Sequence, residues 1–185
     1  KKEQSNVKLI NDPQGLIDRA VFLLSSKSYI NRVLALAALT GRRVAEIGCT
    51  AEFTPFSENI VVFKGQLKTK GKECKDYKIP LLSTTKPIIT CLKGMRLDMP
   101  QYINNPATFH SNCSKELSLR VKKHFSEFVE GDITAKDLRA IYATIACAKY
   151  KKDNRKTPQC YYSEILGHSE DDLNTCNSYF DFYLE

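Results

Sequence analysis

The sequence has few of the patterns that mark metal-binding or secreted proteins. Its 185 residues include three histidines and seven cysteines, and no two cysteines form a Cys-x-x-Cys pair. A structural zinc site needs closely spaced ligands in two clusters, so the spacing argues against one. An odd number of scattered cysteines is typical of reduced thiols, and we therefore expect a cytoplasmic protein.

Long apolar runs and targeting segments are also missing. No stretch approaches the roughly 18 apolar residues of a membrane span, and Lys1-Lys2 is not followed by the apolar region of a signal peptide. A glycine-rich phosphate loop is absent too, which argues against nucleotide hydrolysis. Because the first residue is not methionine, we expect a piece of a longer protein.

Basic charge is what the chain does have. Lys and Arg outnumber Asp and Glu by 28 to 21, which gives a net charge of +7. Such a balance favours a polyanionic partner such as nucleic acid. With 42% hydrophobic residues the composition is that of a globular protein, and we interpret residues 1–185 as one domain.

Helical patterns dominate. Residues 30–39 are apolar nearly all round, which predicts a core helix that ends at Thr40-Gly41. Further helices are expected over about 85–95 and 114–129, the second ended by Gly131. N-cap signals predict other helix starts at Asp12-Pro13, Thr134, Thr157-Pro158 and Ser169, the last of these helices carrying Tyr179.

The pattern changes to that of strands between residues 53 and 81. Apolar residues cluster at 60–63 and alternate with polar ones at 77–81, and a lysine-rich turn lies between them. The sequence therefore predicts an α+β fold, mainly helical, with a small antiparallel β-sheet that carries a lysine-rich hairpin.

Several cations have two interpretations. Lys136 and Arg139 are three residues apart on one helix, so we expect them to share an open face that suits a phosphate, although a solvated basic face is the more common reason for such a pair. Arg43 is either the structural partner of Glu46 or a second phosphate ligand. Charge and spacing alone leave both open.

Two residues near the end of the chain also have both a structural and a catalytic interpretation. His168 follows Gly167, a residue suited to end a helix, where a structural histidine is the usual explanation. Tyr179 and its rival Tyr183 could both be aromatic core residues.

The order of the motifs along the chain favours the catalytic interpretations through a resemblance to a known family. TGRRVAEI is followed by a lysine-rich hairpin ending in IPL, then by KDLR, LGH and a tyrosine. This order resembles the catalytic domain of tyrosine recombinases and type IB topoisomerases over nearly the whole chain. The chain is similar to one branch of this group, the telomere resolvases or protelomerases of the ResT type. Three features carry this likeness: the segment GQLKTK, lysine in place of histidine at 136, and the eleven residues from His168 to Tyr179.

Carried over residue by residue, the resemblance implies six catalytic residues: Arg43, Lys68, Lys136, Arg139, His168 and Tyr179. Arg42 is the second choice for the first arginine, and Lys70 is the rival for the hairpin lysine. We also expect four cations to contact DNA, namely Arg42, Lys64, Lys70 and Lys72.

The resemblance implies a reaction as well. A tyrosine attacks a DNA phosphate to form a 3′-phosphotyrosyl intermediate without ATP, metal or another cofactor, and two subunits on an inverted-repeat telomere junction seal each end into a hairpin. The setting would be the cytoplasm, on a linear replicon or the nucleoid, for a protein of bacterial or phage origin with flanking DNA-binding segments outside this chain. The alternatives are a conventional site-specific integrase, a catalytically silent DNA-binding module and, most weakly, a metal-dependent nuclease.

Overall fold

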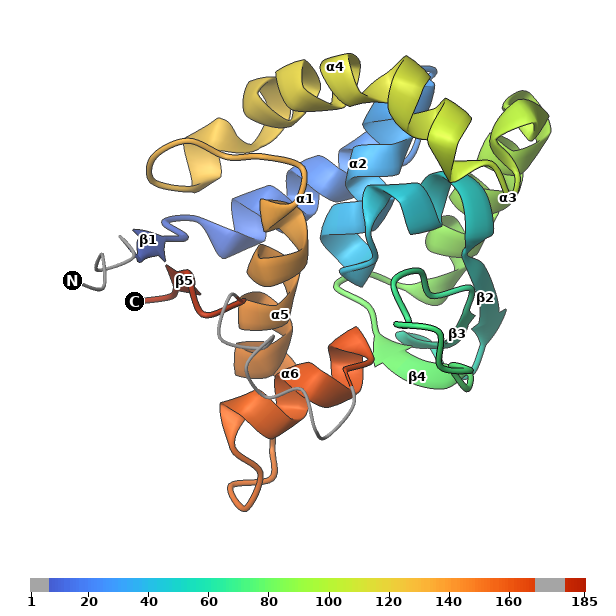
Figure 1. Cartoon of the computed structure of the whole chain (residues 1–185). Helices are drawn as coiled ribbons and strands as arrows, with labels where there is room; N and C mark the ends of the chain where they lie inside the picture. The colour runs from blue at the N-terminus through green and yellow to red at the C-terminus, as the bar shows by residue number, and fades with distance from the viewer. Residues whose placement is uncertain (1–6, 169–178) are drawn as a thin grey trace.

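The computed structural model describes residues 7–168 and 179–185 and is mainly helical, with a small sheet at one side (Figure 1). Its α-helices are α1 (Pro13–Leu23), α2 (Tyr29–Thr40), α3 (Thr85–Asp98), α4 (Pro106–Phe125), α5 (Asp137–Tyr150) and α6 (Pro158–Leu166). Shorter helical turns are η1 (Glu46–Thr50), η2 (Pro100–Tyr102) and η3 (Ser126–Phe128). The strands are β1 (Lys8–Leu9), β2 (Glu52–Pro55), β3 (Ile60–Lys64), β4 (Tyr77–Pro80) and β5 (Phe182–Tyr183). Within residues 7–168 and 179–185, no helix has the length and apolar character that crossing a bilayer requires.

Helix α2 lies at the centre of the core. It contacts α1, α3, α4 and α5, and its residues from Val33 to Thr40 are all buried, which confirms the central helix expected from residues 30–39. The helix ends at Gly41, whose φ is +69°. A side chain there would be strained, and its Cβ would lie 2.0 Å from the ring of Tyr142. Glycine thus lets the chain turn sharply where the core helix meets α5.

The predicted antiparallel sheet is present, with strand order β2-β3-β4. Phe63 pairs with Phe53 on one side and with Tyr77 on the other. Val61, Phe63 and Ile79 are completely buried, so one face of the sheet packs on the helical core. The lysine-rich segment 65–76 joins β3 to β4, as expected for a hairpin.

Two of the predicted helix starts are confirmed in detail. Asp12 Oδ1 accepts a hydrogen bond from the main-chain N–H of Gly15 at 2.8 Å, at the start of α1. Thr157 Oγ1 accepts one from the N–H of Cys160 at 3.2 Å, at the start of α6. Each hydroxyl or carboxylate satisfies an N–H that the first helical turn leaves without a main-chain partner.

Three boundaries in two helices were predicted wrongly. Helix α4 begins at Pro106 and not near residue 114, because Asn105 accepts the N–H of Thr108 at 3.3 Å and caps it there. It also ends at Phe125, before the expected stop at Gly131. Helix α5 begins at Asp137, a turn later than the expected cap at residue 134.

The two ends of the chain pair with each other, which the sequence did not predict. Strands β1 and β5 lie side by side and are parallel, with Lys8 opposite Phe182 and Leu9 opposite Tyr183 (Figure 1). This pairing returns the C-terminal segment to the helical core. The helix expected from Ser169 falls on residues 169–178, outside the described residues.

We expect the core helix α2 to dominate the stability of the fold. Leu36→Ala removes a fully buried side chain and should lower the free energy of unfolding by about 2–5 kcal/mol. Leu97→Ala, at a position on α3 that is 82% exposed, should change it by less than about 0.5 kcal/mol. Urea denaturation of both variants measures the difference, and equal destabilisation would contradict the placement of α2.

Candidate active site

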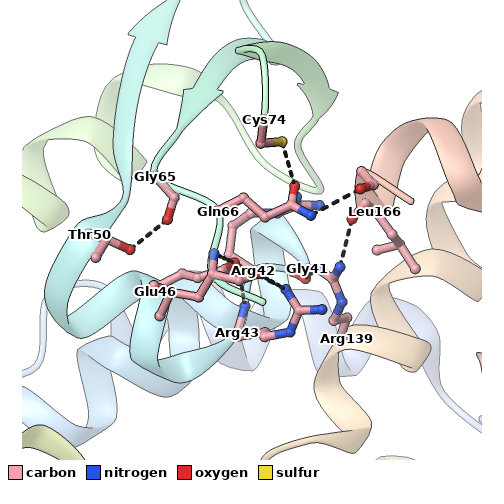
Figure 2. A network of polar contacts seen from close by, with 12 residues as sticks. Gly41, Arg42, Arg43, Glu46, Thr50, Gly65, Gln66, Cys74, Arg139 and Leu166 are labelled. Atoms are coloured by element: carbon pink, nitrogen blue, oxygen red, sulfur yellow. Dashed lines mark hydrogen bonds and ion pairs between the residues drawn. The ribbon is translucent and has the colours of Figure 1, made fainter. Parts of the chain in front are cut away.

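Arg139 belongs to a polar network where α5 meets the ends of α2 and α6 (Figure 2). Its Nη1 donates to the carbonyl of Gly41 at 2.8 Å, its Nη2 to that of Leu166 at 2.7 Å, and its Nε to the hydroxyl of Tyr179 at 3.1 Å. The residue is only 5% exposed. The expectation of an open face shared with Lys136 was therefore wrong, because α2, α6 and the C-terminal segment cover this side of α5.

Burial and like charges shape the electrostatics of this centre. Burial lowers the pKa of Arg139, and Arg42 and Arg43 nearby lower it further. The guanidinium stays charged because an arginine pKa starts above about 12. Its bonds among the described residues engage three of its five N–H groups.

Tyr179 is held against Arg139 by the residues that follow it. The ring of Phe180 stacks on that of Tyr162 in α6, with centroids 4.6 Å apart, and Phe182 in β5 is buried. Tyr183 points elsewhere and is 44% exposed. Of the two candidate tyrosines, only Tyr179 has its hydroxyl at the arginine.

His168 lies close to the same tyrosine. The centroids of the His168 and Tyr179 rings are 5.3 Å apart. The end of α6 places the histidine: Gly167 has a φ of +69°, and the N–H of His168 donates to the carbonyl of Ser163 at 3.0 Å. This is the glycine-ended helix terminus expected from the sequence.

Arg43 and Glu46 form a pair, so the structural interpretation of this arginine holds. Arg43 Nη1 lies 3.2 Å from Glu46 Oε2, and the main-chain N–H of Arg43 donates to Oε1 at 2.8 Å. Glu46 is fully buried in the π-helical turn η1, and Arg96 from α3 donates to the carbonyls of Ile47 and Ala51 around it. The phosphate-binding interpretation is compatible with this pair, because the Arg43 side chain stays 21% exposed.

Arg42 occupies a place that the sequence did not predict. We expected it to contact DNA, but it is 1% exposed, and its guanidinium lies 4.9 Å from the ring centroid of Phe63. It donates to the carbonyls of Thr40 and Ile165 and to the hydroxyl of Tyr77. In this arrangement Arg42 binds protein acceptors inside the fold.

The lysines expected at the site are all at the surface. Lys64, Lys68, Lys70 and Lys72 are exposed along the β3–β4 segment. Lys68 and Lys70 have left-handed backbone with φ of +59° and +53°, which lysine adopts rarely. Lys136 is exposed just before α5, one turn from Arg139, whose N–H donates to the Lys136 carbonyl.

The structure thus brings Arg43, Arg139, His168 and Tyr179 together and leaves the predicted lysines exposed around them. Arg139 at the tyrosine hydroxyl, with the Arg43 guanidinium near Arg139, can stabilise the charge that develops on a phosphate attacked by that hydroxyl. Among residues 7–168 and 179–185, no three acidic, histidine or cysteine side chains lie where they could hold a metal ion. Sequence reasoning missed Gln66 and Tyr77, which bond into this network.

The helical fold and its small sheet are those of the tyrosine-recombinase class. A family model described as the telomere resolvase ResT/TelK catalytic domain matches residues 6–182, and the chain belongs to this family. The protelomerase of Yersinia phage PY54 is 33% identical over 164 residues, which cover 81% of this chain and 26% of that protein. The chain therefore spans about a quarter of this curated relative.

Solved structures of protelomerases have the same fold as this chain. A variant of protelomerase tela covalently complexed with substrate DNA has a TM-score of 0.89 and 25% identity, over 96% of this chain and 60% of that one. Another tela variant, complexed with a DNA hairpin product, has a TM-score of 0.87 and 26% identity, over 94% of this chain and 59% of that one.

The buried carboxylate of Glu46 should support both Arg43 and the neighbouring hairpin. Glu46→Gln keeps the shape but removes the charge that accepts these hydrogen bonds, and should lower the free energy of unfolding by about 1–3 kcal/mol. Glu130→Gln, at an exposed position, serves as the control and should be neutral. Chemical denaturation compares the two variants, and an unchanged stability of Glu46→Gln would refute the role given to this pair.

Proposed function

We propose that this domain cuts and rejoins DNA through Tyr179 and, as part of the longer protein, converts an inverted-repeat junction into hairpin ends. The observation that carries the proposal is the hydrogen bond of 3.1 Å from Arg139 Nε to the Tyr179 hydroxyl, beside His168. An arginine in contact with a tyrosine hydroxyl attracts a phosphate to this nucleophile. It also stabilises the tyrosine oxygen when the hydroxyl loses its proton.

The proposed reaction conserves the phosphodiester bond energy in two steps. The Tyr179 oxygen attacks phosphorus as it loses its proton, the bond to the 5′ oxygen breaks, and that oxygen takes up a proton. A 3′-phosphotyrosyl link remains. In the second step a 5′ hydroxyl attacks this phosphorus, and the tyrosine leaves and regains its proton, so no external energy source is consumed.

The remaining residues receive roles from their positions. Arg43 and Arg139 would bind the non-bridging phosphate oxygens, since both belong to one cluster and arginine forks match two oxygens. His168 and Lys136 are the candidates to handle the tyrosine proton. Lys68, on the exposed hairpin, would protonate the leaving 5′ oxygen, while Lys64, Lys70 and Lys72 contact the DNA backbone.

Hairpin formation as the outcome is supported by the relatives. One similar structure holds tela covalently complexed with substrate DNA, and another holds a DNA hairpin product. By likeness we propose that two copies of the longer protein act on one inverted-repeat junction. The setting would be a linear replicon of a bacterium or a phage, in the bacterial cytoplasm, since a similar protein comes from a phage.

Tyr179→Phe should abolish the covalent product. The full-length protein is incubated in EDTA with a labelled inverted-repeat junction, and adducts and hairpins are resolved on denaturing gels. Wild type should form both, Tyr179→Phe neither, and Tyr183→Phe, at the exposed rival tyrosine, should retain them.

Three results would count against this account. Adducts with Tyr179→Phe would assign the nucleophile elsewhere. Bound but uncut DNA with the wild type would favour a silent DNA-binding module. Products with exchanged strands and no hairpins would indicate a conventional recombinase.

The hairpin lysine should be identified by leaving-group chemistry. Lys68→Ala should slow cleavage of ordinary DNA by about 10²–10⁴-fold, because the leaving oxygen loses its acid. A substrate with sulfur in place of the 5′ bridging oxygen needs no such acid, so it should restore the rate of this variant. Lys70→Ala is the matched comparison. If the sulfur substrate restores the rate of Lys70→Ala and not that of Lys68→Ala, Lys70 is the acid and Lys68 contacts the DNA backbone.

A further inference from the structure

A chain of hydrogen bonds joins the base of the lysine hairpin to the turn that carries His168. Arg42 Nη1 donates to the Tyr77 hydroxyl at 2.6 Å, and that hydroxyl donates to Gln66 Oε1 at 2.7 Å. Gln66 Nε2 then donates to the main-chain carbonyl of Gly167 at 2.9 Å. Figure 2 shows Gln66 reaching from the hairpin toward the end of α6.

The chain of donors has a defined direction. Burial raises the pKa of Tyr77, so its hydroxyl keeps its proton and can donate it to Gln66. Arg42 can only donate, and a carbonyl can only accept. Because both ends are fixed in this way, Gln66 must turn its NH₂ group toward Gly167.

The contact with Gly167 is close. A Cβ added at Gly167 would lie 2.2 Å from Gln66 Oε1 and 2.3 Å from the Tyr77 hydroxyl. Glycine at this position therefore allows the hairpin to approach the main chain next to His168, in addition to ending α6.

On its other side the hairpin base is tied to the first arginine. The N–H of Leu67 donates to Glu46 Oε2 at 2.8 Å, and the carbonyl of Leu67 accepts from Arg43 Nη1 at 3.1 Å. Lys68 is the next residue. The lysine thus follows two residues that are anchored, one to the histidine turn and one to the Arg43–Glu46 pair.

We propose that Gln66 and Tyr77 are positioning residues, which fix the hairpin against Gly167 so that its lysine and His168 reach the same phosphate together. This inference rests on the proposed DNA cleavage, because the lysine has a leaving group to protonate only in that reaction. Neither residue touches the reacting atoms in this account. They act through the main chain on both sides of the phosphate.

The test uses full-length Gln66→Met, which is similar in size, uncharged and unable to make the amide hydrogen bonds with Tyr77, Gly167 and Cys74. Tyr77→Phe is the second variant, because it removes only the central hydroxyl. Gln159→Met, at an exposed position on α6, is the matched control. Adduct formation is timed at saturating junction DNA, with an ordinary or a sulfur-bridged substrate, and affinity for uncut DNA is measured alongside.

Gln66→Met and Tyr77→Phe should each slow cleavage of ordinary DNA by about 10- to 100-fold, as expected for small misplacement of a catalytic group. Affinity for uncut DNA should stay within about twofold of wild type, since no phosphate ligand is removed. The sulfur-bridged substrate should restore most of the lost rate. The double variant should be no slower than the slower single one, because both act through one chain of bonds.

Equal slowing on both substrates would show a merely structural role and overturn the proposal, as would unchanged rates. Absence of adduct with wild type would instead defeat the proposed function. In that case hydrogen exchange still tests the contact between the hairpin and the His168 turn. Gln66→Met should speed amide exchange at His168 as well as in the hairpin. Unchanged exchange at His168 would refute this contact.

Discussion

The carboxyl end of α6 is the point on which the site depends. Three successive main-chain carbonyls, at 165–167, accept hydrogen bonds from Arg42, Arg139 and Gln66, which come from three different parts of the chain. Carbonyls at a helix end lack partners within the helix, and buried ones must find partners elsewhere. Satisfying them draws two guanidiniums to the helix end and sets His168 directly beside them. Fold and site are therefore built by the same bonds.

Most of the fold could be predicted from local patterns, and the errors have physical causes. The core helix over 30–39 was recognisable because burial on all sides leaves no polar face. The start of α4 was missed although Asn105-Pro106 carries the same cap-and-proline signal as the correctly predicted starts of α1 and α6. The surrounding polar residues suggested a loop and outweighed it. The pairing of β1 with β5 could not be foreseen, since two-residue strands have no periodicity and their partners lie at opposite ends of the chain.

The sequence could predict which residues gather at the site, but not what surrounds them. The order of motifs identified Arg43, Arg139, His168 and Tyr179, and the structure gathers these four. Burial of Arg139 was missed because helical spacing reveals one apolar face and cannot show that tertiary neighbours cover the adjacent one. The role of Gln66 has no sequence signal of its own, since a glutamine becomes informative only when its acceptor, far along the chain, is known.

The central claim is that the Tyr179 oxygen becomes bonded to DNA. The most direct measurement traps the adduct of the full-length protein on nicked junction DNA, digests both polymers, and locates the modified residue by mass spectrometry. The account predicts a nucleotide linked through its 3′ phosphate to Tyr179. A nucleotide on Tyr183, or a linkage through a 5′ phosphate, would contradict it.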